Sequence, residues 1–484
     1  MFLEFVVAFA AIVILAFVGA EIQRRRVYRV SGKGPSHPNS TGVLGMLYHL
    51  FPLPGRIESV ALRHFELYKK YGREDGLYMG VLGHRILIFV ADPVAYKQIF
   101  TQTKVFPKFQ LGSTLFLGSE NLALANGDIW KTQRHIINPA FYNINYFCPT
   151  FLDLTDKGLD AWSSMLASEP NDFLEVSPSS HITNITIDIL GKTLLGVDFG
   201  AMENKTILAL ESYYFLFKSM DNTLSLLFPF LYKVPTQYNK MFWFHLNNFN
   251  SFMSNVISKS RKKIIDQSNV SHLTLLDMMV ASQDQDTNAK LSDQELRDNA
   301  VVFFLASHDT SAASLGFALY ELGNQHEMQN RLYQEILNVV GPTEAPTYEQ
   351  LNNMPFLINF VTEVLRLYPP VGSVIPRVNT RDCVLSGYHV PKGAIIIPQI
   401  WCTHHSDMYY GDNVDEFDPD RHSKGNIDSF ANIPFGSSQR KCIGQQFSLI
   451  EQRMFLVRLL QRFKIDLCKV NRISDDFKIR LSKR

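Results

Sequence analysis

Near its C-terminus the chain reads Phe435-Gly436-Ser437-Ser438-Gln439-Arg440-Lys441-Cys442-Ile443-Gly444. A helical pattern follows from Ile443 to about Phe463, with apolar residues at intervals of three and four that predict one buried stripe. A thiol at the start of a helix and beside two cations has its ionised form favoured. We therefore expect Cys442 to be a thiolate, although a lone cysteine is more often an ordinary buried residue. If Cys442 binds a ligand, Arg440 lies two residues away and is placed to pair with an acid group on that ligand.

The spaced pattern Phe-Gly-x-Ser-x-Arg-x-Cys-x-Gly resembles the haem-binding loop of the cytochrome P450 haem-thiolate monooxygenases, of the eukaryotic microsomal, membrane-anchored type. The resemblance implies a mainly α fold with a smaller β-rich part (α+β). It also implies haem b lying between a long central helix and the helix that follows the cysteine loop. In that reading Cys442 is the iron ligand, and Phe435 and Arg440 are haem-binding residues.

The composition is that of a folded protein with a large core. The chain has 484 residues, of which 46% are hydrophobic, enough for one large domain or two smaller ones. A formal charge of +1 gives no reason to expect a nucleic-acid partner. The five cysteines are odd in number and have no paired spacing, which points to a reducing compartment.

The N-terminal segment predicts a membrane anchor. Residues 1–20 are apolar apart from Glu4, long enough to span a bilayer core of roughly 30 Å, and a basic cluster at Arg24–Arg26 follows. A cleaved signal peptide would carry its basic residues before the apolar run, so the charge order favours an uncleaved anchor with the body in the cytosol. We expect a linker at 21–40 and a catalytic domain at 41–484, and the resemblance implies a single-pass protein of the endoplasmic reticulum.

One long helix is predicted through the middle of the chain. Ser292 and Glu295 form a capping box, and apart from Gly316 no breaker appears before Gly323, so about 30 residues are helical. Polar groups interrupt an apolar run at Ala306-Ser307-His308-Asp309-Thr310-Ser311. By resemblance, Asp309 and Thr310 are the acid–threonine pair that delivers protons to bound dioxygen. Ser307 stands where the family usually has glycine, so the sequence does not settle whether the helix is kinked at this point.

Two further sets of residues match the family in order along the chain. Trp130 and Arg134 lie one helical turn apart, a pair that is often mere surface packing, and by resemblance they hold a haem propionate. Arg377 matches a second propionate-binding arginine.

Glu363 and Arg366 are spaced as a helical ion pair. The resemblance implies that this pair is buried, has a structural role and is held by Arg421. In the segment around Arg421, Asp420 and His422 replace the family's usual glutamate and aromatic residue.

Three other segments carry weaker signals. Two apolar runs around Gly83-His84 predict a β-hairpin between Gly76 and Val90, and residues 106–124 predict a long functional loop that exposes Phe116. Cys402, His404 and His405 suggest zinc, but no second ligand pair follows, so we expect a solvated loop.

The resemblance implies a monooxygenase that hydroxylates a lipophilic molecule such as a fatty acid, sterol or terpenoid. It would use O₂ and two electrons from NADPH through NADPH–cytochrome P450 reductase, with cytochrome b5 as a further partner. Two alternatives remain, a haem-thiolate isomerase or dehydratase and a non-catalytic haem sensor or carrier. The expected substrate pocket is apolar and includes Phe116, Phe304, Ala306, Val371 and Ile375.

Overall fold

The computed structural model describes Val18, Ile22 and residues 60–82, 85–109, 115–205, 207–220, 229–266, 273–284, 288–425, 427–468 and 477–484. The predicted anchor (all but Val18), the predicted linker (all but Ile22) and the Gly83-His84 turn lie outside these residues. In the described part of the chain, no helix combines the length and the apolar character needed to cross a bilayer. The chain divides into two compact units, the first comprising 1–110, 366–416 and 424–442, the second 111–365, 417–423 and 443–484.

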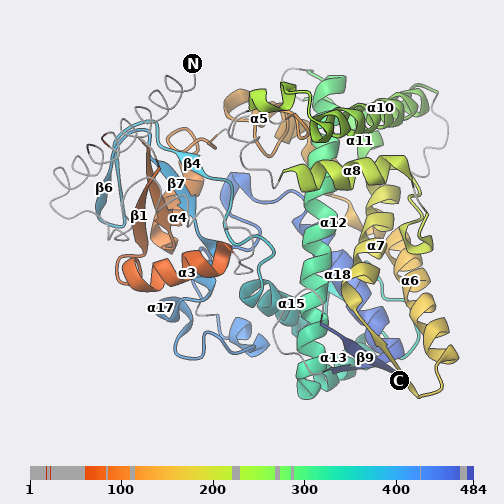
Figure 1. Cartoon of the computed structure of the whole chain (residues 1–484). Coiled ribbons are helices and arrows are strands. Elements are labelled where there is room, and N and C mark those ends of the chain that lie inside the picture. Colours follow the sequence, from red (N-terminus) through yellow and green to blue (C-terminus); the bar gives the residue numbers. More distant parts are fainter. Residues whose placement is uncertain are drawn as a thin grey trace. The chain divides into compact units, whose positions relative to one another are not determined.

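The first unit is built on a four-stranded sheet in the order β1-β2-β7-β4 (Figure 1). The predicted hairpin is confirmed, since β1 and β2 pair antiparallel. Strand β2 also pairs in parallel with β7, which joins segments about 300 residues apart in the sequence. The elements of this unit are α3 (Val60–Tyr71), β1 (Leu77–Leu82), β2 (Arg85–Val90), α4 (Pro93–Thr101), β4 (Arg377–Val378), β5 (Cys383–Leu385), β6 (Tyr388–Val390), β7 (Ile395–Pro398), α16 (Ile400–His404), α17 (Asp407–Tyr410) and η7 (Ser438–Arg440).

Both faces of this sheet are covered by apolar side chains. Alternate residues of β2 belong to different clusters: Ile86 and Ile88 pack in one with residues of α4, and Leu87 and Phe89 pack in the other with residues of α3. This alternation is the period of two that a strand imposes. A strand buried on both faces positions the segments that flank it, including β7.

The second unit is mainly helical, with a small sheet in the order β3-β9-β8. Its elements are α5 (Gly127–Ile137), η1 (Asn138–Phe141), η2 (Ile144–Phe147), α6 (Cys148–Ser168), β3 (Phe173–Val176), α7 (Pro178–Leu190), η3 (Gly191–Leu195), η4 (Ala201–Glu203), α8 (Leu208–Ser219), η5 (Pro229–Lys233), α10 (Gln237–Ile265), α11 (Leu275–Ala281), α12 (Asp293–Asn324), α13 (His326–Val339), α14 (Tyr348–Asn352), α15 (Pro355–Leu367, whose last two residues belong to the first unit), η6 (Pro419–Ser423), α18 (Gln445–Arg462), β8 (Phe463–Leu467) and β9 (Ile479–Lys483).

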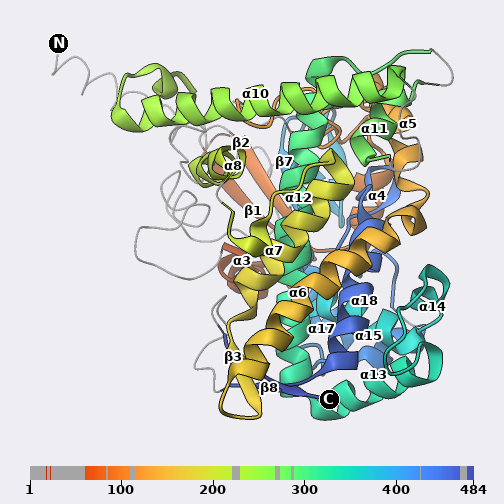
Figure 2. The same cartoon turned by 90° about the vertical axis from the view of Figure 1, so that its right-hand side faces the viewer.

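Helix α12 is the axis of this unit. It has 32 residues and begins at the predicted capping box, where Ser292 and Glu295 exchange side-chain and backbone hydrogen bonds. At 1.5 Å per residue it is about 48 Å long. It packs against α7, α10 and α18, and Figure 2 shows α7 and α18 alongside it. The long central helix and the mainly α fold with a smaller β part are confirmed.

Three local expectations are wrong. Helix α18 begins at Gln445, not at Ile443, and is buried almost all round, so a single apolar stripe does not describe it. Phe116 is buried, not exposed, because its ring packs on two other aromatic rings. Cys402 and His404 lie in the buried helix α16 and not in a solvated loop.

Candidate functional site

The cysteine loop is closed by its own backbone. The amide of Cys442 donates to the carbonyl of Phe435 at 2.9 Å, and Gly436 turns the chain at a left-handed φ of 69°, which favours glycine. Residues Ser438–Arg440 form the short helix η7, which packs against α4 within the same unit. The loop therefore has a defined conformation that holds the cysteine near its end.

Cys442 differs from the other cysteines in its exposure. None of the five forms a disulfide, and Cys442 alone among them is exposed. Burial raises the pKa of the Cys148 thiol to about 11 and raises that of Cys402 as well, so both stay neutral. Exposure of Cys442 argues against the reading of an ordinary buried cysteine. Among the five, Cys442 is the residue most open to an external partner.

Arg377 presents a buried cation in the same unit. Its residue is 3% exposed on β4, and its Nε and Nη1 atoms have no hydrogen-bond partner among the described residues. The guanidinium lies over the ring of Phe100, 5.8 Å from the centroid. Burial lowers the pKa of Arg377 to about 10, which still leaves it charged at neutral pH. A buried cation with free donors fits an anionic ligand.

In the second unit, α5 carries Trp130 and Arg134 one turn apart, both half-buried. Of the predicted haem-binding residues, these two belong to this unit, whereas Phe435, Arg440, Cys442 and Arg377 belong to the first.

Helix α12 has one uncovered stripe at the predicted proton-relay segment. Ala306 and Ala313 are exposed and Asp309 and Thr310 are half-buried, whereas the residues on the other sides of the helix are mostly buried. The spacing of three, four and seven places these four on one face. The Thr310 hydroxyl donates to the Ala306 carbonyl at 2.7 Å, the back-bond to residue i−4 that hydroxyl side chains make in helices. With Ser307 in place of glycine, α12 runs unbroken through this segment.

Next to the acid lies a histidine that the sequence reasoning missed. His308 is buried, and its Nε2 lies 3.1 Å from Oδ1 of Asp309. Tyr213 of α8 contacts the same nitrogen at 3.4 Å. The tyrosine comes from a helix nearly 100 residues earlier, so no local pattern signalled the contact.

The expected pocket residues separate into three places. Phe116 and Phe304 meet in one aromatic cluster, where each ring packs on Tyr213. Ala306 lies on the exposed stripe of α12. Val371 and Ile375 belong to the first unit, and Val371 is exposed.

Of the predicted structural residues, Glu363 is fully buried and binds Arg421. Arg421 Nε donates to Glu363 Oε1 at 2.9 Å, and His422 Nε2 lies 2.8 Å from Oε2. Arg366, one turn further along α15, donates to the backbone carbonyls of His404 and Glu416. The unusual residues near Arg421 have partners, since His422 binds Glu363 and Asp420 accepts a bidentate pair from Arg331.

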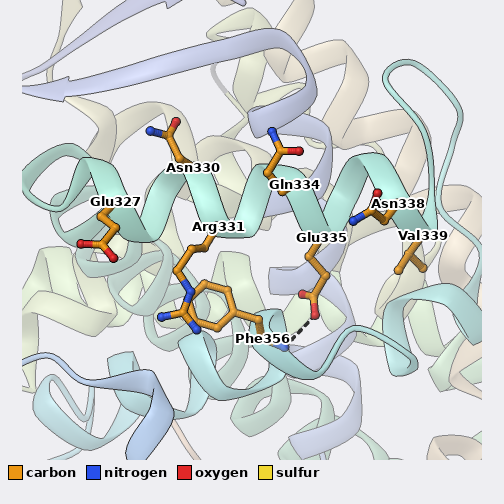
Figure 3. A pocket seen from close by; sticks show the side chains of 8 residues that line it. All are labelled: Glu327, Asn330, Arg331, Gln334, Glu335, Asn338, Val339 and Phe356. Atoms are coloured by element: carbon orange, nitrogen blue, oxygen red, sulfur yellow. Dashed lines mark hydrogen bonds between the residues drawn. The ribbon is translucent and has the colours of Figure 1, made fainter.

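A shallow surface groove lies elsewhere in the second unit. It runs along α13 and is lined by Glu327, Asn330, Arg331, Gln334, Glu335, Asn338, Val339 and Phe356 (Figure 3). Arg331 stacks on the ring of Phe356 at 4.1 Å, and Glu335 accepts hydrogen bonds from the first amides of α15. None of the predicted site residues lines it. In the described part of the chain, no group of three or more His, Cys, Asp or Glu residues is arranged to hold a metal ion.

Comparison with known proteins identifies the family. The family model for cytochrome P450 matches residues 39–481. Cytochrome P450 3A5 of Homo sapiens is 29% identical over 420 residues, covering 84% of this chain and 82% of the relative. Cytochrome P450 3A31 of Mesocricetus auratus is 27% identical with the same coverage, and echinocystic acid 23-monooxygenase of Saponaria officinalis is 28% identical over 83% of this chain and 78% of the relative.

Haem b is the prosthetic group of this family. The residues present fit it, since an exposed thiol suits an iron ligand and a buried arginine with free donors suits a carboxylate. The described residues thus supply both kinds of contact that the group requires. The chain belongs to the cytochrome P450 family and is a haem monooxygenase.

Proposed function

We propose that this chain hydroxylates a lipophilic small molecule with O₂ and two electrons from NADPH, delivered through NADPH–cytochrome P450 reductase. The observation that carries the proposal is the exposed Cys442 on its backbone-closed loop. An exposed thiol near two basic side chains is in a setting that favours the thiolate over the thiol.

The haem-binding roles are those that the family resemblance implies, and the chemistry of the side chains fits them. Cys442 ligates the iron, and Arg377 neutralises a propionate with donors that the described protein leaves unused. Arg440, Trp130 and Arg134 are further propionate contacts, and Phe435 is a further haem-binding residue. A thiolate-ligated haem supplies electron density that favours O–O bond cleavage.

Proton delivery is assigned to the exposed stripe of α12. Asp309 is the acid, and the Thr310 hydroxyl, whose single hydrogen is bonded to the Ala306 carbonyl, accepts a hydrogen bond from the acid side and donates onward when it releases that carbonyl. The half-buried position of both side chains allows water to reach them on one side.

The substrate class is inferred from the apolar pocket candidates. Phe116, Phe304, Ala306, Val371 and Ile375 offer no charge, so we expect a fatty acid, sterol or terpenoid. One relative is an echinocystic acid 23-monooxygenase by name, which supports this class. Difference absorption spectra of the ferric holoprotein with compounds from each class test it.

The location and partners follow the sequence pattern at the N-terminus. We propose a single-pass anchor at residues 1–20 in the endoplasmic reticulum membrane, with the catalytic domain 41–484 in the cytosol. The reductase then docks from the same side, and cytochrome b5 is a further electron donor.

The ligand assignment is tested by Cys442→Ala. The variant is expected to lose the red-shifted Soret band of the ferrous carbon monoxide complex, which reports thiolate ligation. Cys468→Ala is the matched control, because Cys468 is a free, partly buried cysteine at the end of β8. A red-shifted band that persists in Cys442→Ala refutes the assignment.

A further inference from the structure

His308 occupies a position in α12 where both ring nitrogens have defined partners. Its side chain is fully buried, although the neighbouring Asp309 side chain is 38% exposed. Nδ1 lies 2.8 Å from the backbone carbonyl oxygen of Phe304. Nε2 lies 3.1 Å from Oδ1 of Asp309 and 3.4 Å from the hydroxyl of Tyr213.

Hydrogen-bond chemistry limits how many protons the pair can hold. A carbonyl only accepts, so Nδ1 of His308 carries a hydrogen. Nε2 then either bears a second hydrogen or is bare and accepts from the Tyr213 hydroxyl. An ionised carboxylate only accepts, so a hydrogen bond between Nε2 and Asp309 Oδ1 requires one proton between the two atoms. With that proton present, either the histidine is charged or the carboxyl is protonated, and the pair has no net charge.

The side chains that contact the pair from the neighbouring helices are uncharged. From α8, Tyr213 and Tyr214 approach, and burial first, then the charge of Asp309, raises the pKa of both phenols, that of Tyr214 to about 12. From α7, the Thr186 hydroxyl donates to the His308 carbonyl at 3.3 Å. From α10, Phe249 contributes a ring that packs on Tyr213. None of these groups exchanges a proton with the pair near neutral pH, so none of them competes as a proton source.

We propose that His308 supplies and orients the proton that Asp309 delivers. This role rests on the proposed function of Asp309 and makes His308 a positioning residue. The shared proton moves from Nε2 of His308 to the carboxyl of Asp309, and Asp309 releases it toward the Thr310 side. The pair then carries one negative charge until water at the exposed side of Asp309 returns a proton. The buried imidazole thus keeps the acid loaded between turnovers.

The first test compares His308→Gln with wild type. Glutamine retains an N–H donor but does not titrate, so it can orient Asp309 without supplying a proton. In the holoenzyme with reductase and NADPH, and without an organic substrate, peroxide released per NADPH is expected to rise several-fold. This excess should grow as pH rises from about 6 to about 8, because free protons in solution become scarcer and the variant has no imidazole to supply one.

The matched control is His245→Gln. His245 is also a buried histidine, but its Nδ1 bonds to the Ser212 hydroxyl at 3.0 Å, away from α12. It should leave both the peroxide yield and its pH profile unchanged. An equal response from His245→Gln would overturn the proposal, because the effect would then reflect lost packing.

The second test counts the proton directly. With histidine labelled with nitrogen-15, the signal lost in His308→Gln identifies this ring, and the infrared carbonyl band lost in Asp309→Asn identifies the acid. We expect either a protonated Nε2 or a protonated carboxyl at neutral pH. A bare Nε2 beside an ionised Asp309 overturns the proposal.

The peroxide yields of three variants separate the role of His308 from the role of the Asp309–Thr310 pair. If Asp309→Asn and Thr310→Ala raise peroxide release and His308→Gln does not, the role of His308 alone is refuted. If none of the three changes the peroxide yield, the acid–alcohol relay itself is refuted, and the role of His308 with it.

Discussion

The buried charge of Arg377 affects both the stability of the protein and its affinity for a ligand. A charged side chain that is 3% exposed, with two nitrogens unbonded among the described residues, costs free energy in the protein without haem. Such a cost is tolerated where a ligand removes it. The same arginine therefore lowers the stability of the apoprotein and raises its affinity for an anion.

Arg377→Gln is expected to weaken haem binding by roughly tenfold to a hundredfold, the loss of one charge-assisted hydrogen-bond contact. Unfolding of the apoprotein in urea should show unchanged or higher stability, because the desolvated charge is gone. Titration of haem into apoprotein measures the first quantity. Arg480→Gln is the control, since Arg480 forms an exposed pair with Glu175. Equal affinities in Arg377→Gln and wild type would contradict the assignment.

At the scale of elements, Glu363 joins α15 to η6. Its two oxygens bind Arg421 and His422, and its Oε1 also accepts from the amide of Asp418. Arg331 of α13 holds Asp420 of the same short helix. The segment 417–423 is thus fixed by side chains from two helices.

Glu363→Ala leaves the buried Arg421 without its carboxylate, and we expect a loss of about 3–5 kcal/mol in the free energy of unfolding. Glu175→Ala breaks an ion pair whose side chains are both more than 40% exposed, so its effect on the free energy of unfolding should be small by comparison. Denaturant unfolding of both variants checks the contrast. Similar losses would show that burial does not set the importance of the Glu363 cluster.

A polar seam between α12 and α18 makes stability depend on pH. Ser311 and Ser448 are in hydrogen-bond contact at 3.0 Å, and Ser314 donates to Gln452 at 2.7 Å. Glu451 lies in the same seam, and burial raises its pKa to about 8. The folded state therefore binds more protons than the unfolded state between about pH 4.5 and about pH 8, so stability falls as pH rises through this window.

Glu451→Gln is expected to remove this fall, because glutamine does not ionise. Near pH 7 the variant should be more stable than wild type by about 3 kcal/mol, from the difference between the two pKa values. Urea midpoints measured across the window for both proteins give the comparison. Parallel pH profiles would mean that Glu451 is ionised in the folded protein.

The elements that could be predicted are those with local signals. The capping box of α12, the hairpin of β1 and β2, and the end of α15 before Pro369 all follow from a few adjacent residues. The misses depend on distant partners. Phe116 is buried because its ring packs on rings from α8 and α10. The Nε2 atom of His308 has a partner in Tyr213, which lies on a different helix. Tertiary packing of this kind leaves no trace in local periodicity.

The N-terminal segment is predicted to anchor the protein in a membrane. Residues 1–20 are long and apolar enough to span, and Arg24–Arg26 follow on the predicted cytosolic side. Deletion of residues 1–20 is expected to release most of the protein from membranes extracted with alkaline carbonate, with the carbon monoxide spectrum unchanged. Arg24, Arg25 and Arg26 replaced together by Gln form the matched control, which keeps the apolar span and should stay in the membrane. Full retention of the deletion variant would place the membrane attachment in another part of the chain.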